Sequence, residues 1–464
     1  MNNLKLNKRN TFLIGLAFFA TLMLWQIYNN YCPLILDLLL KSKYGADYDT
    51  EFIVGVIMAM DNVVALILMP IIGMLSDKTK SRFGKRMPYI LVGMLLTGVV
   101  FPFIAVAFIL NSLTGVIIFM ALVLVIMTCY RNPVVALMPD VTPKPLRSLA
   151  NGIINLVGYI GAILAAVMGM IWSFKGDNGE IILSRGQEVA IYPFAITSAF
   201  ILVLMVILGI RINENKLVAD ALASITEGEK KADTFTNVET TKLSKKDKAN
   251  LFVLLGSVFL WFMAFNAVET FNSTFTTKIL GSSGIASTGV MILTGASILT
   301  FMLLSPLASK IGRKMVVIIG LIALIFGFGV IAIGTYAFPG GILTVLMYVS
   351  CAILGFGWAL ININSYPMVV ELSNKGNVGK FTGYYYIGSM LAQSITPILL
   401  GLIIKLTNSG TNGTNNNNIK FLYPYACIFA IGALILFLFV KSRFVKGKIQ
   451  TKKGIEALGD PEDN

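Results

Sequence analysis

The sequence predicts an all-α integral membrane protein whose twelve transmembrane helices form two pseudo-symmetric six-helix bundles. Three observations support this fold class: the composition, the length and number of the apolar runs, and a basic segment that occurs twice at half the chain length. Of the 464 residues, 56% are hydrophobic and only 13% are charged. A soluble domain of this length cannot bury so many apolar side chains, so the composition indicates a membrane protein.

Each apolar run is long enough to cross a bilayer. A helix rises 1.5 Å per residue, so about 20 residues span the ~30 Å of hydrocarbon. We expect the spans, in chain order, at residues 11–36, 51–75, 88–110, 115–138, 148–172, 190–211, 250–277, 286–308, 315–337, 342–369, 379–405 and 421–441.

The basic residues predict the topology. When the connections are assigned alternately to the two sides, one side receives 29 Lys and Arg residues, including those of both terminal segments, and the other receives 7. This positive-inside bias places both termini in the cytoplasm of a multi-pass protein in the cell membrane. A nucleic-acid-binding patch would not alternate from loop to loop, so the net charge of +14 does not indicate such a partner. The first run is too long for a signal-peptide core and lacks a small-residue cleavage site, so we expect no cleavable signal.

A basic segment between apolar runs occurs in both halves of the chain. Residues 73–88 read GMLSDKTKSRFGKRMP, and residues 305–314, which begin 232 positions later, read SPLASKIGRK. The first span also carries W-x-x-Y-N at residues 25–29, and the seventh carries W-x-x-x-F-N at residues 261–266. Several echoes at similar offsets indicate two parallel repeats related by an axis along the membrane normal.

Four regions follow from this organisation. We expect an N-terminal six-helix bundle at residues 1–211, a partly helical cytoplasmic linker at 212–249, a C-terminal six-helix bundle at 250–445 and a cytoplasmic tail at 446–464. The linker is polar and mixes both signs of charge, which is typical of a connection rather than a span.

The repeated segment resembles the loop between helices 2 and 3 of the major facilitator superfamily, with the pattern G-x-x-x-D-[RK]-x-G-[RK]-[RK]. The first copy has four extra residues before Gly84. That longer form is similar to the sugar:cation symporters, especially the sucrose/proton branch of the glycoside-pentoside-hexuronide family. The second copy has Ser309 where the pattern has Asp. The resemblance implies the major facilitator fold and a transporter that exposes a central site alternately to each side.

The resemblance also implies a cytoplasmic gate. In this superfamily, acids at the ends of spans 4 and 10 pair with the loop arginines and bias alternating access. The alternative is ordinary positive-inside charge with screened pairs worth ~0–1 kcal/mol. The candidate gate residues are Asp77, Arg82, Arg86, Asp140, Arg313 and Glu371.

Three charged residues lie well away from the ends of predicted spans, where an ionised group is costly and therefore suggests a function. Asp61 in span 2 and Arg131 in span 4 lie at similar depths, so they could form a pair that protonation releases, or a fixed structural pair. Glu269 in the outer half of span 7 either lines the cavity or reaches the outer interface. We expect Asp37 and Lys278 at the membrane interface.

The expected coupling ion is the proton. The chain has no His, so a carboxylate must carry the proton. The sodium-type relatives have Asp at two positions of span 2 that are Ala65 and Met69 here, and a further Asp where this chain has Arg131, before Pro133. Sodium prefers hard oxygen ligands, and these are missing from the expected places. We expect no metal and no cofactor.

A sugar site needs aromatic faces together with groups that satisfy hydroxyls. Trp25, Tyr28, Asn29 and Asn266 are the main candidates, because the two asparagines recur beside aromatics in both halves. For the other mid-span amides, the favoured alternative is a helix–helix hydrogen bond worth ~0.6 kcal/mol. These amides are Asn62, Asn132, Asn155, Asn362, Asn364 and Gln393.

Together these features predict a secondary active transporter that takes up a sugar or glycoside, of disaccharide type, with protons. A proton-driven exporter of an apolar small molecule is one alternative, and its cavity would carry few amides. A non-transporting substrate sensor on the same fold is the other, and it would carry a folded cytoplasmic domain. An enzyme is not expected, because the aqueous segments show no nucleophile–base set, metal cluster or phosphate loop.

Overall fold

The computed structural model describes residues 6–45, 48, 50–142, 147–177, 180–182, 187–223, 245–304, 311–370, 378–408 and 418–441. Within these ranges, twelve helices are long and apolar enough to cross a membrane. This number confirms the predicted fold class. One short hairpin in the connection between spans 5 and 6 departs from the purely helical expectation.

Six spans build the N-terminal half. Its elements are α1 (Lys8–Tyr44), α2 (Glu51–Lys78), α3 (Met87–Val100), α4 (Pro102–Ile109), α5 (Leu113–Val141), α6 (Arg147–Ile171), β1 (Lys175–Asp177), β2 (Glu180–Ile182), η2 (Gln187–Ala190), α7 (Ile191–Arg211) and α8 (Glu214–Ala223). The third span is divided into α3 and α4 at Pro102, which has no backbone N–H to donate and whose ring clashes with the preceding turn.

Six further spans build the C-terminal half. Its elements are α10 (Lys245–Leu280), α11 (Ser283–Leu304), α13 (Arg313–Ala337), α14 (Gly340–Val370), α15 (Val378–Asn408), η3 (Asn418–Phe421) and α16 (Leu422–Leu438). The predicted linker is helical at both of its ends, in α8 and in the first residues of α10. Residues 224–244 between these helices lie outside the described chain.

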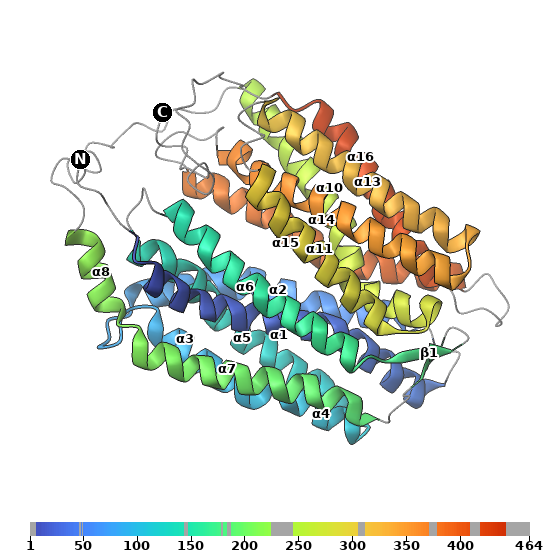
Figure 1. The fold of residues 1–464 in the computed structure, drawn as a ribbon, viewed down its shortest axis with the longest axis horizontal. Helices are drawn as coiled ribbons and strands as arrows, with labels where there is room; N and C mark the ends of the chain where they lie inside the picture. Colours follow the sequence, from blue (N-terminus) through green and yellow to red (C-terminus); the bar gives the residue numbers. More distant parts are fainter. Residues whose placement is uncertain are drawn as a thin grey trace.

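The helix packing has two-fold pseudo-symmetry (Figure 1). Within the halves, α1 packs on α6 as α10 packs on α15, and α3 packs on α5 as α13 packs on α14. Between the halves, α2 packs on α15 and α6 packs on α11, while α1 packs on α10. In span order, α1, α2 and α6 are spans 1, 2 and 5, and α10, α11 and α15 are their counterparts, spans 7, 8 and 11. Replacing each helix by its counterpart turns the α2–α15 interface into the α6–α11 interface and leaves the α1–α10 interface unchanged. A two-fold axis between α1 and α10 therefore relates the halves, as the parallel repeats predict.

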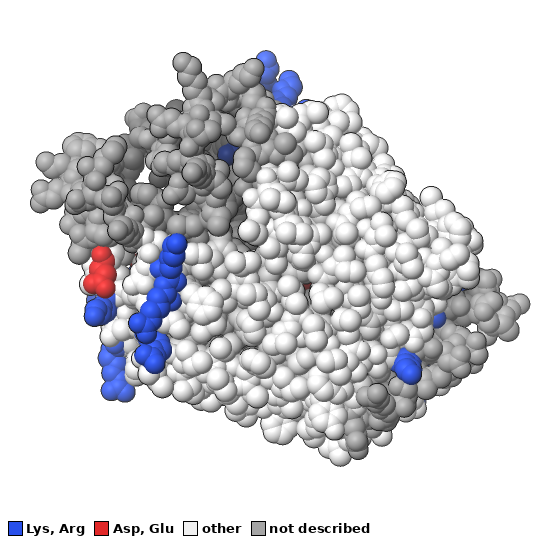
Figure 2. Space-filling model, viewed as in Figure 1, with Lys and Arg blue, Asp and Glu red and all other residues white. Residues whose placement is uncertain are grey.

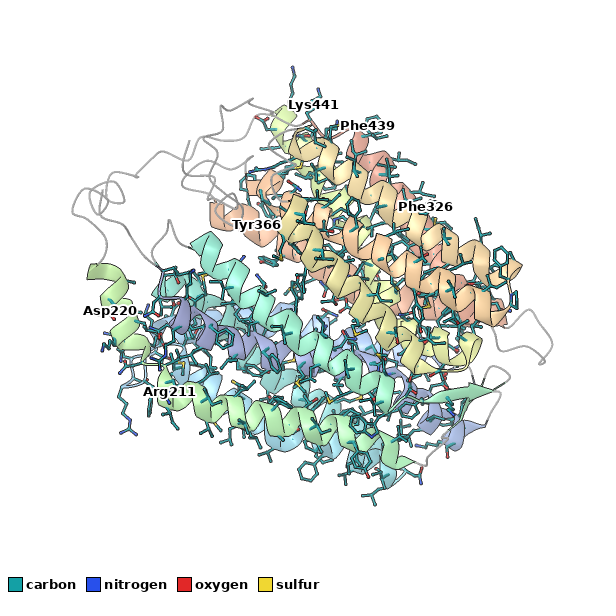
Figure 3. The ribbon with its side chains drawn as sticks, viewed as in Figure 1. Arg211, Asp220, Phe326, Tyr366, Phe439 and Lys441 are labelled. Carbon is teal, nitrogen blue, oxygen red and sulfur yellow. The ribbon has the colours of Figure 1, made fainter. Side chains whose placement is uncertain are left out.

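The molecule has two distinct ends along its helices. In the N-terminal half, one end consists of α8 and the α2–α3 connection. In the C-terminal half, the same end includes Lys441, whose backbone carbonyl accepts a hydrogen bond of 2.9 Å from Asn250 Nδ2. Arg211, Asp220 and Lys441 mark this α8 end in Figure 3. The opposite, hairpin end carries β1 and β2, and Lys175 of β1 forms a bridge with Ser282 of the α10–α11 connection.

Apolar side chains cover the outer surface of the helices. Phe252 is 80% exposed, Ile210 75% and Leu303 73%. Phe326 and Phe439 project outward from the C-terminal half (Figure 3). On the face shown in Figure 2, the described charged side chains lie towards the two ends and leave a broad uncharged middle. Such a belt is suited to acyl chains rather than water, so the chain is a multi-pass membrane protein.

Glycines permit the closest helix approaches. A Cβ on Gly161 of α6 would lie 2.4 Å from the carbonyl oxygen of Phe19 in α1. A Cβ on Gly55 of α2 would lie 2.2 Å from the carbonyl oxygen of Pro397 in α15. The second contact joins the two halves at the hairpin end, so any larger residue there would push the halves apart.

Candidate functional site

A carboxylate of one half is bound by two donors of the other half, near the centre of the molecule. Glu269 of α10 accepts a hydrogen bond of 3.1 Å from Trp25 Nε1 and one of 3.2 Å from Asn29 Nδ2, both through Oε1. Trp25 and Asn29 lie four residues apart on α1 and therefore share one face of that helix. The three side chains form a polar bridge across the pseudo-two-fold axis.

A guanidinium completes this group, which we call the central site (Trp25, Tyr28, Asn29, Arg131 and Glu269). Arg131 of α5 lies over the Trp25 ring, 5.5 Å from its centroid, and attracts the Glu269 carboxylate electrostatically. The Tyr28 ring stacks on the Trp25 ring, with 6.1 Å between the ring centroids and 15° between the ring planes. The structure thus brings together five residues that the sequence singled out separately.

Part of the central site is exposed to solvent. Glu269 is solvent-exposed although it lies within a membrane-spanning helix, and Trp25 and Arg131 are half-buried. Tyr28 is fully buried and Asn29 nearly so. From the other half, Tyr386 of α15 is 50% exposed and interacts electrostatically with Arg131. Residues 384–386 are a run of three tyrosines, and the sequence does not show which ring faces the other half.

The chemistry of the site is that of recognition and proton binding. The carboxylate accepts hydrogen bonds, the guanidinium donates them, and the indole offers a flat apolar face beside both. Among the described residues, no group of three or more His, Cys, Asp or Glu side chains could hold a metal ion. The arrangement can therefore bind a neutral polar molecule between the halves and bind a proton on Glu269.

Other residues predicted for this region have different positions. Asn266 Nδ2 donates to the carbonyl of Phe262 at 2.7 Å, so its donor is used within α10. Asn155, Asn362 and Asn364 likewise donate to carbonyls one turn earlier in their own helices, rather than to neighbouring helices. The Asp61 side chain lies outside the part that the structure describes, so its pairing with Arg131 stays a prediction.

A second charged group lies at the α8 end, within the N-terminal half. Arg86 Nε donates to Asp140 Oδ2 at 2.9 Å, and the same guanidinium also binds Asp77 and the Ser76 hydroxyl. Burial alone would lower the pKa of Arg86, but hydrogen bonds and attraction from Asp140 and then Asp77 outweigh it and raise that pKa. The guanidinium therefore stays charged and joins α2, the start of α3 and the end of α5.

Glu214, the first residue of α8, positions this group and was not predicted. Its carboxylate accepts from the backbone N–H groups of Lys85 at 3.0 Å, Arg86 at 2.9 Å and Met87 at 2.9 Å. These are free donors at the N-terminus of α3, where a negative charge is favourable. Gly84 has a φ of +110°, and a Cβ there would lie 2.2 Å from Glu214 Oε2. The glycine of the repeated segment thus makes room for a residue 130 positions later.

The other predicted gate residues do not join the Arg86 group in the described structure. The exposed Arg82 guanidinium lies over the Phe83 ring, 4.8 Å from the ring centroid. The backbone carbonyl of Arg82 accepts a hydrogen bond of 3.1 Å from Asn215 Nδ2. Arg313 is the first residue of α13 and is half-buried. Glu371 and positions 305–310 of the second copy lie outside the described residues.

Asp37 and Lys278 face each other between the two halves, near the hairpin end of α1 and α10. Their side chains are only 2% and 1% exposed, and Lys278 Nζ binds both Asp37 and Glu51 between the halves at the hairpin end. Hydropathy places a residue along its own helix but does not show which partner faces it. The interfacial depth expected for both residues stays a prediction, while their enclosure between the halves had no signal in the sequence.

Comparisons with known proteins agree with this architecture. The sequence matches the family model described as Major Facilitator Superfamily over residues 11–397 and again over residues 296–458. No curated protein sequence matches.

Several solved structures share the fold. The xylose transporter XylE from E. coli, in an inward-open conformation, has 16% identity and a TM-score of 0.65, covering 97% of this chain and 98% of its own. A D-xylose-proton symporter has 16% identity and a TM-score of 0.65 over 94% and 97%. A D323A mutant of the nucleoside transporter NupG has 15% identity and a TM-score of 0.62 over 92% and 99%.

Proposed function

This chain belongs to the Major Facilitator Superfamily, and from that membership we propose that it takes up a sugar or glycoside together with protons across the cell membrane. Solved proteins of the same fold include a xylose transporter and a D-xylose-proton symporter, which supports the substrate class and the coupling ion. The observation that carries the proposal is the central site, where Glu269 of one half binds Trp25 and Asn29 of the other beside Arg131.

The side chains of the central site suit a polyhydroxyl compound. The Trp25 face can pack against the C–H face of a sugar ring, while Glu269 accepts from hydroxyls and Arg131 donates to them. An apolar substrate would exclude water from both charged groups without offering either a hydrogen bond, and desolvating a charge without full compensation is costly. The site therefore favours a sugar over the apolar compound of the export alternative.

Glu269 is the proposed proton carrier. When ionised, it attracts Arg131 and accepts both hydrogen bonds from α1. Protonation removes the negative charge and turns one carboxylate oxygen into a donor, which weakens the bridge between the halves. A bound sugar can then take over the freed donors of Trp25 and Asn29. Asp61 remains the second candidate carrier, and Asn266 remains a weaker candidate for substrate contact.

The α8 end is proposed to face the cytoplasm, because the basic residues of the connections concentrate there. The Arg86 group then lies at the inner mouth. Arg86, Asp77 and Asp140 all belong to the N-terminal half. The group therefore connects three helices within one bundle and does not join the two bundles. It would form one side of the inner gate, with Arg313 and Glu371 as the proposed counterparts and Arg82 at its rim.

Transport into proteoliposomes tests the proposal. Labelled pentoses, hexoses and disaccharides are offered under an imposed inward proton gradient and, separately, an inward sodium gradient. We expect one sugar to accumulate with protons and to leak out when a protonophore is added. Glu269→Gln should abolish accumulation but retain exchange of labelled for unlabelled sugar, because exchange needs no net proton movement.

Matched variants make the result decisive. Asp220→Asn on α8 is an exposed acid-to-amide control and should transport normally. If Asp61→Asn abolishes accumulation while Glu269→Gln does not, Asp61 is the carrier and the assignment of Glu269 is wrong. Accumulation under sodium alone would overturn the proton assignment. Absence of sugar movement under either gradient would overturn the substrate class.

A further inference from the structure

We propose that the buried ion cluster of Asp37, Glu51 and Lys278 is a latch that holds the hairpin end of the two halves closed. Opening towards that side would require Lys278 to leave both acids. The inference goes beyond the proposed transport of a sugar, because it concerns a separate group of charges, two helical turns or more from the central site along α1 and α10. It makes no use of the substrate or the coupling ion.

The cluster is compact and enclosed. Lys278 Nζ donates to Asp37 Oδ1 at 3.0 Å and to Glu51 Oε1 at 2.8 Å, and the three side chains are 1%, 2% and 6% exposed. The Thr50 hydroxyl donates to the same oxygen of Asp37. Lys41 lies 3.8 Å from the other oxygen of Asp37 and is 13% exposed. Two acids and two lysines therefore balance one another.

The charges are divided unequally between the halves. Asp37, Lys41 and Glu51 belong to α1 and α2 of the N-terminal half, and Lys278 alone comes from α10 of the C-terminal half. If the halves separate at this end, Lys278 loses both partners at once and leaves two acids facing one lysine. A charge that loses its partner while still buried is strongly destabilising. Intermediate separations are therefore disfavoured until water reaches the cluster.

Neighbouring contacts show that this end is closed in the structure. Asn30 Nδ2 donates to Ser287 Oγ at 3.1 Å, and Phe174 and Ser283 exchange two hydrogen bonds of 2.8 and 2.9 Å. The close approach of Gly55 to Pro397 lies at the same end. Each of these contacts joins the two halves, so the ion cluster lies inside a tight interface rather than on a surface.

Ions suit a contact that must break repeatedly. Apolar residues of similar size often hold a buried interface as well as or better than an ion pair does. Once separated, however, apolar residues would expose their surface to water, whereas a carboxylate and an ammonium are well hydrated. An ionic contact can therefore be strong when closed without penalising the open state, which is what alternating access requires.

Labelling of a hidden cysteine tests the latch. Thr274 is 3% exposed and lies one helical turn before Lys278 on the same face of α10. Thr274→Cys, in a variant whose four natural cysteines are replaced by Ala, is treated from outside with a membrane-impermeant maleimide. We expect Lys278→Met to raise the labelling rate by about tenfold or more, because the latch no longer opposes the open state.

Lys41→Met is the matched control. It also removes a lysine from Asp37, but this contact lies within α1 and does not join the halves. We expect labelling to stay at the parent rate. An equal rise in Lys41→Met and Lys278→Met would overturn the proposal, because the effect would then reflect loose packing of α1 rather than separation of the halves.

Two further variants separate gating from misfolding. Glu51→Gln keeps an acceptor oxygen for Lys278 and removes only the charge, so we expect a smaller rise in labelling. The exchange of Asp37→Lys with Lys278→Asp retains an ion pair across the interface and should restore slow labelling. Unchanged labelling in both Glu51→Gln and Lys278→Met, in protein that elutes as a single folded species, would overturn the latch. Raised labelling in Lys278→Met supports the latch even if the protein carries no sugar, because the label reports only separation of the halves.

Discussion

Glu269 accepts two hydrogen bonds through a single oxygen, and both come from the opposite half of the molecule. Its second oxygen is left to meet a ligand or a proton. Trp25 contributes a donor towards Glu269 and a ring face towards Arg131, so one side chain serves both charges. Trp25 therefore has two separate roles in the site, and a single substitution can remove one while keeping the other.

Trp25→Phe tests this division at the residue level. The ring face remains while the indole N–H is lost, so the carboxylate keeps one donor, Asn29. A hydrogen bond to a charged group contributes ~1.5–3 kcal/mol when buried, and partial exposure reduces this value here. We expect the KM for the transported sugar to rise by up to about tenfold, with kcat changed less.

Trp172→Phe is the control for this measurement, because Trp172 stacks on Tyr192 away from the central site. Its KM should match that of the parent protein. A normal KM in Trp25→Phe would show that the indole N–H does not contribute to the site. Trp25→Ala should cost more than Trp25→Phe, since it also removes the ring face.

At the level of elements, α8 acts as an external cap on α3. Helices leave their first N–H groups without partners, and a side chain usually caps its own helix. Here Glu214 caps a helix that begins 127 residues earlier in the chain. The same helix contributes Asn215, which binds the carbonyls of Ser81 and Arg82. The first helix after span 6 thus holds the α2–α3 connection in place.

Glu214→Ala should therefore destabilise the N-terminal half. Loss of a helix cap costs ~0.5–2 kcal/mol, and three donors lose their acceptor here, so we expect a value near the upper end. Thermal unfolding of the purified protein in detergent measures the shift. Asp220→Ala, on the exposed side of the same helix, should unfold at the parent temperature; an equal loss in both variants would assign the effect to α8 itself.

Element positions could be predicted well from the sequence, because a bilayer requires long apolar runs. All twelve runs became spans. The ends were less predictable: α1 reaches Tyr44, eight residues past the predicted boundary, because a helix continues through polar residues that hydropathy does not count. The break in the third span was signalled by Pro102 itself, but a search for continuous apolar runs does not take single prolines into account. The β1–β2 hairpin had none, since its strands are only three residues each.

At the level of the whole molecule, side-chain partners were the least predictable feature. Depth along a helix identified Arg131 and Glu269, and the repeat identified Asn29, so most of the central site could be found residue by residue. Which of them meet depends on how six helices rotate against six others, and hydropathy carries no such information. For the same reason the sequence did not show that Asp37 and Glu51 enclose Lys278. The pairing of Asp61 with Arg131 stays a prediction, and among the described residues Trp25 and Glu269 lie near Arg131.

The interface between α2 and α15 offers a test of closure that involves no charge. Gly55→Ala would place a Cβ 2.2 Å from the Pro397 carbonyl, so the two helices must move apart at the hairpin end. We expect faster maleimide labelling of the Thr274→Cys reporter than in the parent. Gly152→Ala on α6, where a Cβ meets nothing within 4 Å, should leave the rate unchanged. If Gly55→Ala labels no faster, the close approach is not needed for closure.

The attachment of α8 to the α2–α3 connection determines where this polypeptide can be divided. The predicted boundary after residue 211 would separate Glu214 and Asn215 from the loop that they hold. Two genes that encode the halves as separate chains should therefore be divided after Ala223, so that α8 stays with the first product. A fluorescent domain inserted beyond that residue would leave the cap intact, whereas the same insertion at Ile212 would remove it.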